Sequence, residues 1–578
     1  MNPLNRLDSR RSANFHKNLS PHYPAMLLSE SSMTFLRSWD QRKLPASNSN
    51  TLLVQKLLIT LFQVLVCTLQ AQNEDGSWGC KQGEPSAYAI LTLVSLASLP
   101  VAVAIKPHIL AAIKKGRMFL SDLPSSIEPD YIWIEKVTYR SKNFHQAYVL
   151  AALNAPLIEQ GFKGKISQVF HLPWERIVKL EKLSKRLPLF ASFPDWTIKA
   201  SLIEGYLFLP QLNSIRLDVF PRKNMAEDKY FEYIPFAWTS TNNLKRAHLR
   251  GTFLREMMII SFLNYQADEY METSVSTCFA DRLDDARDLI DRLFDELRSK
   301  TNGHSKNLPY GNTSEDGSAP EVENGEPSSD KGRTSKKRKI GPDEPIATNK
   351  VDSSNDESSV ERENEIRETL RRFVGHVLDH PTVQSASRYD KGRLRHELRT
   401  FLLAHVDQIE DNRRLSGNLA PSKAPSRTFF DWVRRTGSDH TSCPYSFAFA
   451  VCLLGEGDDF FSSSNEKYFA QATCRHLATL CRMYNDIGSV ARDRVEENLN
   501  SLDFPEFHTA RTIPLQDNVL KDLIYQLATF ERKCLELALG NLRATSRELT
   551  LRFVNTFIDV TDMFGQIYVE KDIASRMK

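Results

Sequence analysis

The chain has 578 residues, 41% hydrophobic and 25% charged, a composition typical of globular proteins with sizeable buried cores. Lys and Arg number 75 against 72 Asp and Glu, a balance that gives no electrostatic case for bulk binding of nucleic acid or a membrane surface. The eight cysteines are scattered and form no CxxC pair, so we expect free thiols in a reducing compartment.

The first part of the chain has no signal for export. Residues 1–50 are polar, rich in Ser and Asn and lack the apolar core of a signal peptide, so we interpret them as a loosely ordered lead-in. Two apolar stretches follow, at 57–71 and 89–113, but polar residues and prolines interrupt both. Neither offers the roughly 20 uninterrupted apolar residues that a membrane span needs, so we expect buried helices and no transmembrane segment.

Apolar residues recur with helical spacing along most of the chain, which predicts an all-α protein. Residues 51–205 indicate short helices separated by Pro and Gly, and helical patterns continue over 206–297 and 361–578. Between them, residues 298–360 are almost devoid of apolar side chains, and such a segment cannot offset its chain entropy by burial. We therefore expect a disordered insert that splits one helical domain made of 206–297 and 361–578.

A basic run, Lys336–Lys339, lies within this insert. It is either a nuclear-localisation signal or a solvated charge run in a disordered loop. We favour the second interpretation and expect a cytoplasmic location.

A glycine-rich turn, Gln72–Gly79, precedes the helical pattern of 87–93. It carries a glutamine and a tryptophan, which suits a unit that clamps neighbouring helices. We expect this turn to be structural rather than catalytic.

The first candidate for chemistry is an acidic patch at the end of an apolar helix. Asp268 and Glu272 are four residues apart, so on a helix they share one face. The preceding residues 257–267 are apolar almost all round, which predicts a buried helix where unpaired carboxylates are costly. Acidic pairs are common on exposed helices, but a buried pair favours a bound cation.

The second candidate is a ladder of oxygen ligands. Asn485, Ser489 and Asp493 are spaced by four, and Arg482 lies three residues before the first of them. Mg²⁺ takes oxygen ligands and usually keeps waters and substrate phosphates, while a guanidinium pairs with phosphate oxygens. Two such helices facing each other predict a magnesium cluster that grips a diphosphate, with Arg482 in direct contact with it. This chemistry is typical of class I terpene synthases.

Longer segments strengthen this interpretation, and the chain resembles the fungal labdane-type diterpene synthases of the bifunctional copalyl diphosphate/ent-kaurene synthase group. The resemblance covers roughly residues 50–297 and 361–575, and it is carried by LNYQADEYME (263–272), YIWIEKVTY (131–139), the segment 200–238 and DHTSCPYSFAFAVCLL (439–454). It implies an all-α class I domain over 206–297 and 361–578, preceded at 51–205 by a partial α-barrel like the β domain of class II cyclases. In that family the DExxE and NDxxSxxxD motifs hold three Mg²⁺ ions. By match, the metal ligands are Asp268, Glu272, Asn485, Asp486, Ser489 and Asp493.

One motif of the family is missing from these residues. Class II cyclisation uses a protonating DxDD motif, and the nearest sequences, Asp281–Asp285 and Glu456–Asp459, do not have that spacing. We therefore expect no class II activity and a partial class II half. A separate class II cyclase is then the expected partner, unless the gene sequence is truncated.

The resemblance implies a class I diterpene synthase that releases diphosphate from copalyl diphosphate and cyclises the carbocation to a kaurene- or pimaradiene-type hydrocarbon. One alternative is direct use of geranylgeranyl or farnesyl diphosphate. Another is a non-catalytic relic or helical scaffold that binds a prenyl diphosphate or a class II partner. Chain-elongating prenyl diphosphate synthases fit less well, because they carry two DDxxD motifs.

Aromatic side chains near these motifs are candidates for stabilising a carbocation by cation–π attraction. They are Tyr265, Tyr445, Phe447 and Phe449. For each of them an ordinary core position is the simpler expectation.

Overall fold

The computed structural model describes residues 20–43, 48–124, 132–134, 137–139, 141–157, 162, 166, 172–220, 230–303, 353–416, 427–508 and 516–570. The regular structure in these ranges is helical apart from one antiparallel pair of short strands, β1 (Ile132–Ile134) and β2 (Val137–Tyr139), with Ile132 opposite Tyr139. The prediction of an all-α protein is confirmed. All eight cysteines are free thiols.

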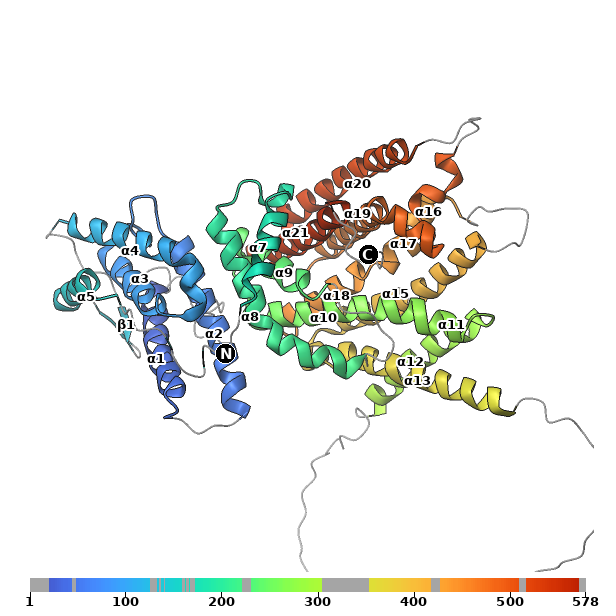
Figure 1. Ribbon diagram of the computed structural model, residues 1–578, viewed down its shortest axis with the longest axis horizontal. Helices are drawn as coiled ribbons and strands as arrows, with labels where there is room; N and C mark the ends of the chain where they lie inside the picture. Colours follow the sequence, from blue (N-terminus) through green and yellow to red (C-terminus); the bar gives the residue numbers. More distant parts are fainter. Residues whose placement is uncertain are drawn as a thin grey trace, which may run out of the picture.

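The N-terminal helices form a group of their own at the left of Figure 1. They are α1 (His22–Asp40), α2 (Asn48–Gln70), α3 (Gly83–Leu96), the 3-10 turn η3 (Pro100–Ile105), α4 (Lys106–Ser121) and α5 (Lys142–Asn154). Helix α3 lies in the middle of this group and contacts α1, α2, α4 and α5. Its side chains are buried on almost every face, as expected for an apolar helix in a core.

The expectation of a loosely ordered lead-in is wrong for residues 22–40, which form helix α1. Ala25, Ser29, Met33 and Leu36 recur every three or four residues and are buried against the neighbouring helices. The stripe contains serines, and this hides it in the sequence. The Ser29 hydroxyl is satisfied locally, because it donates to the Ala25 carbonyl oxygen at 2.7 Å.

The Gln72–Gly79 turn ties helices together, as the sequence predicts. The Gln72 amide donates to the carbonyl oxygens of Gly76 (3.1 Å) and of Ala112 in α4 (2.9 Å). The Trp78 indole is fully buried and donates to the Thr68 carbonyl oxygen in α2 at 2.8 Å. Gly76 has a φ of +92°, and a Cβ there would collide with the backbone of α4, so only glycine fits this turn.

The C-terminal helices form the larger part of the molecule. They are α7 (Trp174–Ser184), η4 (Pro188–Phe190), α8 (Asp195–Val219), α9 (Tyr233–Leu244), α10 (Gly251–Tyr270), the π-helical turn η5 (Met271–Val275), α11 (Ser276–Cys278), α12 (Leu283–Gly303), α13 (Ser353–Leu378), α14 (Pro381–Ser385), α15 (Arg388–Ser416), α16 (Phe429–Arg434), α17 (Thr436–His440), α18 (Cys443–Leu454), α19 (Ser464–Glu496), the 3-10 turns η6 (Ser501–Asp503) and η7 (Pro505–Phe507), α20 (Asp517–Thr545) and α21 (Glu548–Glu570). Helix α19 packs on α20 and α21, while α10 packs on α8, α9 and α18.

Two boundaries differ from those expected from the sequence. Helix α8 runs through Gly205 without a break, so the division placed between 205 and 206 falls inside one helix that contacts both α2 and α9. Helical backbone also extends to Gly303 and resumes at Ser353, further into the 298–360 segment than its composition indicates. The basic run Lys336–Lys339 lies outside the described residues.

One described helix, Leu53–Gln70, is long and apolar enough to cross a membrane by length and composition alone. Of that window, 56% is buried inside the protein, and a core helix passes the same test. The bent pair Gly83–Leu96 and Pro100–Ser121 passes only if its two helices count as one span.

Candidate active site

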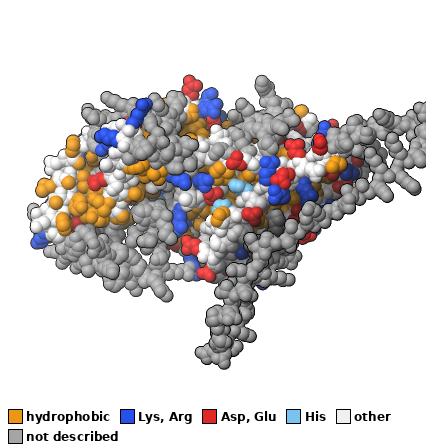
Figure 2. Space-filling view, turned by 90° about the horizontal axis from the view of Figure 1, so that it is seen from below, with side chains coloured by type: hydrophobic (Ala, Val, Ile, Leu, Met, Phe, Trp, Pro, Cys, Tyr) orange, Lys and Arg blue, Asp and Glu red, His pale blue; other side chains and the backbone are white. Residues whose placement is uncertain are grey.

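A cavity of about 260 Å³ lies among the C-terminal helices, and its wall takes residues from α10, α15, α18, α19 and α21. Its acidic, basic and carboxamide lining includes Asp268, Glu269, Glu272, Arg482, Asn485, Arg492, Asp493 and Glu496. Charged side chains of both signs gather around histidines in the middle of the face in Figure 2, whereas hydrophobic side chains are more prominent over the N-terminal helices at the left. The two patches predicted from the sequence therefore meet at one cavity.

The α10 patch opens toward this cavity. Asp268 lies in the last turn of α10, and Glu272 lies in the π-helical turn η5 that follows. A π-helical turn holds one more residue per turn than an α-helix, so the spacing expected for a regular helix is altered here. Both carboxylates still line the cavity. Neither receives a hydrogen bond from any residue within the described ranges.

The environment of these two carboxylates disfavours their charge. The Asp268 side chain is 40% exposed, but it faces a cavity walled by protein rather than open solvent. Desolvation raises the pKa of Asp268, and the positive charges of Arg492 and Arg482 oppose that rise. Desolvation and the neighbouring Asp268 charge raise the pKa of Glu272. A cation bound between them would remove both causes.

The α19 patch is organised differently. Asn485 is half-buried and lines the cavity, and so does Asp493. Asp493 already accepts two hydrogen bonds on Oδ2, from the Ser489 hydroxyl at 2.5 Å and from the Asn500 amide at 2.7 Å. Ser489 is buried behind this contact and does not line the cavity. The ladder is thus held in place before any ligand arrives.

Asp486 does not line the cavity. It is 1% exposed, forms an ion pair with Arg482 Nε at 2.9 Å, and accepts hydrogen bonds from the Ser501 backbone N–H (3.0 Å) and hydroxyl (2.5 Å). Burial raises its pKa to about 6, and the Arg482 charge opposes this. Asp486 therefore anchors Arg482 and the start of η6 to α19.

Arg482 lines the cavity and is held on three sides. Besides the ion pair with Asp486, it donates to the Leu499 carbonyl oxygen at 3.0 Å. Its guanidinium carbon lies 4.8 Å from the centre of the Trp432 ring. A cation fixed in this way presents positive charge to the cavity without having to be ordered by a ligand.

Two histidines beside Asp268 carry no signal in the sequence. His405 of α15 and His440 of α17 are 35 positions apart, and the fold brings their rings to 4.0 Å between centroids. Desolvation lowers the pKa of His405 to about 3 and that of His440 well below its usual value. Both rings are therefore neutral at physiological pH. Arg492 and Glu496 were also missed, although both lie on the face of α19 that the ladder defines.

The remaining wall combines aromatic side chains with uncharged polar ones. Tyr230 and Tyr265 stack with centroids 3.5 Å apart, and the Tyr265 hydroxyl lies 2.7 Å from that of Tyr568. Other aromatic side chains in the wall are Trp238, Phe401, Phe557 and Phe564. Of the four aromatic residues singled out from the sequence, Tyr265 lines the cavity. Tyr445, Phe447 and Phe449 belong to the buried core.

The oxygen-bearing side chains of this cavity fit a divalent cation that prefers oxygen ligands. Asp268 and Glu272 are carboxylates that no described residue donates to, and Asn485 and Asp493 present further oxygens from the opposite helix. Mg²⁺ is bound in proteins by one or two carboxylates together with waters and substrate phosphates. The residues can therefore hold such an ion together with an anionic ligand, with Arg482 and Arg492 nearby.

Comparison with known proteins gives homologues along nearly the whole chain. A pimaradiene synthase from Emericella nidulans is 40% identical over 95% of this chain and 54% of its own length. An ent-kaur-16-ene synthase from Fusarium fujikuroi is 32% identical, covering 97% and 56%, and a phyllocladan-16-alpha-ol synthase from Phomopsis amygdali is 33% identical, also covering 97% and 56%. The chain thus spans about half the length of the curated relatives it matches.

Other comparisons add little to this. No protein-family model matches the chain. Isoprene synthase from grey poplar leaves aligns over 97% of this chain and 98% of its own, with 11% identity and a TM-score of 0.38. At that score we make no comparison of the two sites.

Proposed function

We propose, for a chain homologous over nearly its whole length to fungal diterpene synthases, that it is a class I diterpene synthase. In this proposal it releases diphosphate from copalyl diphosphate and cyclises the resulting carbocation to a tricyclic or tetracyclic hydrocarbon of the pimaradiene or kaurene type. The observation that carries the proposal is the meeting of two acidic patches at one aromatic cavity, with the carboxylates of one patch lacking any described donor.

The ligands proposed for Mg²⁺ are Asp268 and Glu272 on one side and Asn485 and Asp493 on the other. Ser489, which is buried behind Asp493, is proposed to hold that carboxylate in place by donating to it. Three bound ions would supply the Lewis acidity that neutralises the departing diphosphate. We assign Asp486 to positioning Arg482 instead of to the ligand set.

Arg482 is proposed to bind diphosphate oxygens from a fixed position. Its contacts with Asp486, Leu499 and Trp432 are in place without a ligand, so little side-chain entropy is lost when the anion binds.

The aromatic wall is proposed to hold the hydrocarbon part of the substrate and to exclude water. Tyr230, Tyr265 and Phe564 present ring surfaces on which a carbocation would be stabilised by about 2 kcal/mol when desolvated. Water must be excluded until cyclisation is complete, because it would trap the cation.

Copalyl diphosphate is the product of a class II reaction, and the residues of this chain contain no DxDD motif. We therefore propose that a class II cyclase active site supplies it. A cytoplasmic location remains our expectation and is part of the proposal.

The test is hydrocarbon formation and diphosphate release by the purified protein with Mg²⁺, given ent- or normal copalyl diphosphate, geranylgeranyl diphosphate or farnesyl diphosphate in separate reactions. We expect a diterpene from one copalyl isomer only. Asn485→Ala should reduce that rate at least about 100-fold, because it removes an oxygen from the α19 ladder. Asn541→Ala, on the exposed side of α20, removes the same side chain away from the cavity and should have no effect.

Each of the other possible outcomes would contradict part of the proposed function. Products from geranylgeranyl or farnesyl diphosphate alone would contradict the assignment of copalyl diphosphate. Labdane-derived cyclic products from geranylgeranyl diphosphate would contradict the expected absence of class II activity. No release of diphosphate from any of them would favour a non-catalytic scaffold.

A further inference from the structure

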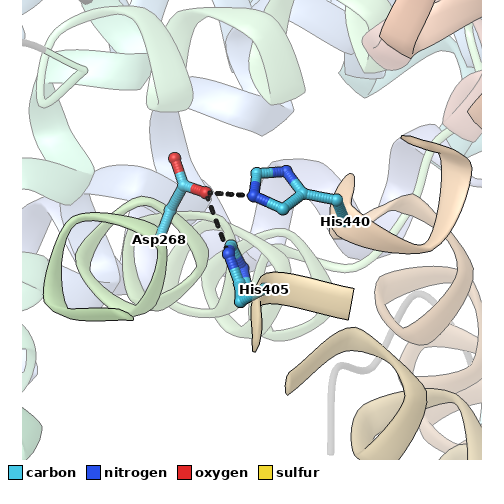
Figure 3. A group of neighbouring side chains, drawn as sticks. All are labelled: Asp268, His405 and His440. Carbon is cyan, nitrogen blue, oxygen red and sulfur yellow. Dashed lines mark ion pairs between the residues drawn. The ribbon is translucent and has the colours of Figure 1, made fainter. Parts of the chain in front are cut away.

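Asp268 has two unusual neighbours in the cavity wall. His405 Nδ1 lies 3.6 Å and His440 Nε2 lies 3.7 Å from the same oxygen of Asp268, Oδ1. Figure 3 shows both imidazoles pointing to that oxygen, one from α15 and one from α17. One ligand atom of each of the three residues lies within 4.8 Å of the others.

Both histidines have nitrogens without a partner. His405 is 1% exposed, and neither of its ring nitrogens has a hydrogen-bond partner among the described residues. The same holds for His440 Nε2. Leaving a buried polar atom unpaired destabilises a protein, so such atoms call for an explanation. Phe401, whose ring lies 4.6 Å from that of His405, offers no polar group.

The separations fit ligands around one ion. Transition-metal ions bind imidazole nitrogen and carboxylate oxygen at about 2.0–2.2 Å, which places tetrahedral neighbours about 3.3–3.6 Å apart. The observed 3.6 and 3.7 Å between the histidine nitrogens and Asp268 are close to that range. The two histidine nitrogens lie within 4.8 Å of each other, so the rings also have to approach one another to complete the set.

We propose that Asp268, His405 and His440 form a mixed nitrogen–oxygen site for a divalent transition-metal ion of the Co²⁺ or Zn²⁺ kind. Two imidazoles and one carboxylate suit such ions, whereas Mg²⁺ favours oxygen ligands. The site does not depend on the proposed function. Its consequence does, because a transition metal bound here competes with Mg²⁺ for Asp268 and lowers the rate of diphosphate release.

The experiment is Co²⁺ titration of the purified chain of residues 1–578 without Mg²⁺, followed by its visible ligand-field absorption. We expect stoichiometric binding that excess Mg²⁺ displaces poorly. His405→Phe and His440→Phe should each weaken Co²⁺ binding about tenfold or more. His405→Phe keeps the ring volume and removes only unpaired nitrogens, so the fold should tolerate it. His396→Phe, at an exposed position of the same helix α15, is the matched control and should bind Co²⁺ like the wild type.

X-ray absorption of the Co²⁺-loaded wild type provides a second measurement that needs no variant. Scattering from two imidazoles supports the site, and an all-oxygen ligand shell overturns it. Unchanged Co²⁺ affinity in both variants also overturns it. The two proposals can fail separately. If histidines bind Co²⁺ but the protein releases no diphosphate, only the proposed synthase activity is rejected. If diphosphate is released with Mg²⁺ but no histidine binds Co²⁺, only the proposed transition-metal site is rejected.

Discussion

The two acidic patches of the cavity are built in opposite ways. On α19, Asp493 and Asp486 accept hydrogen bonds from Ser489, Asn500 and Ser501 in a network that forms without a ligand. On α10 and η5, Asp268 and Glu272 receive no hydrogen bond from a described residue, and burial raises the pKa of both carboxyls.

The two patches therefore differ in how they depend on a cation. A buried carboxylate with donors is stabilised before any cation binds, whereas one without donors destabilises the fold until a cation arrives. We therefore expect substitutions in the two patches to move stability in different directions, even where both reduce activity.

The largest effect is expected for Asp268→Asn. It should lower the rate of diphosphate release at least about 100-fold, because a carboxylate ligand is replaced by a neutral amide. Without metal the variant should be no less stable than the wild type, since the charge that burial disfavours is gone. Activity assays and chemical denaturation in EDTA measure the two quantities. Glu536→Gln, the same kind of change on the exposed face of α20, is the control. A clear loss of stability in Asp268→Asn would contradict the comparison.

Asp486→Asn should lose stability as well as activity. The change leaves the Arg482 guanidinium, which is 7% exposed, without its counter-charge. Breaking a buried ion pair on one side costs about 3–5 kcal/mol. Denaturant titration at pH 7.5 should show a loss of this order, where Asp268→Asn shows none. Equal stability of the two variants would mean that Asp486 does not stabilise the fold through its ion pair with Arg482.

Gly488→Ala tests whether the α19 patch depends on close packing. A Cβ at Gly488 would overlap the Tyr568 carbonyl group of α21, a backbone atom that cannot rotate away. We expect a loss of about 3 kcal/mol from overpacking, together with lower activity because α19 shifts. Gly540→Ala in α20 is the matched control. A Cβ there meets nothing within 4 Å, so this variant should gain about 0.5–1 kcal/mol. A neutral Gly488→Ala would show that the two helices can separate without cost.

The sequence allowed the all-α class and the meeting of the two patches to be predicted, because helical spacing and side-chain chemistry are local properties. The sequence also contains the reason why Asp486 lies apart from the other residues of the α19 patch. Asn485, Ser489 and Asp493 follow a four-residue spacing, while Asp486 is one residue out of step and stacks on Arg482, four residues before it. The resemblance to known motifs groups Asp486 with the ladder, but helix geometry separates it.

Other features depend on tertiary contacts that no local pattern encodes. His405 and His440 reach Asp268 only because α15 and α17 pack beside α10. Helix α1 was missed because serines occupy part of its buried stripe, where the Ser29 hydroxyl bonds to the backbone of the same helix. The π-helical turn at Glu272 was not predicted either, since nothing in the surrounding residues departs from an ordinary helical pattern.

A buried carboxylate remote from the cavity sharpens the comparison. Glu204 is fully buried where α8 meets α2 and α9, and it accepts hydrogen bonds from the amides of Gln63 (2.8 Å) and Asn243 (2.7 Å). Burial raises its pKa to about 7, although the two donors oppose the rise. Donors alone therefore do not keep a buried carboxyl at its usual pKa.

The smallest of the predicted effects follows from this shift. Between the unfolded value of 4.5 and about 7, the folded protein holds a proton on Glu204 that the unfolded chain has released. The free energy of unfolding therefore falls as pH rises through this window, by about 2 kcal/mol between pH 5 and 8 for this group. Other groups with raised pKa add changes of the same sign, so the informative quantity is the difference between the wild type and Glu204→Gln. Denaturation at several pH values should give a flatter dependence for the variant. Parallel curves for the two proteins would mean that the amides of Gln63 and Asn243 outweigh burial, so that Glu204 titrates alike in the folded protein and the unfolded chain.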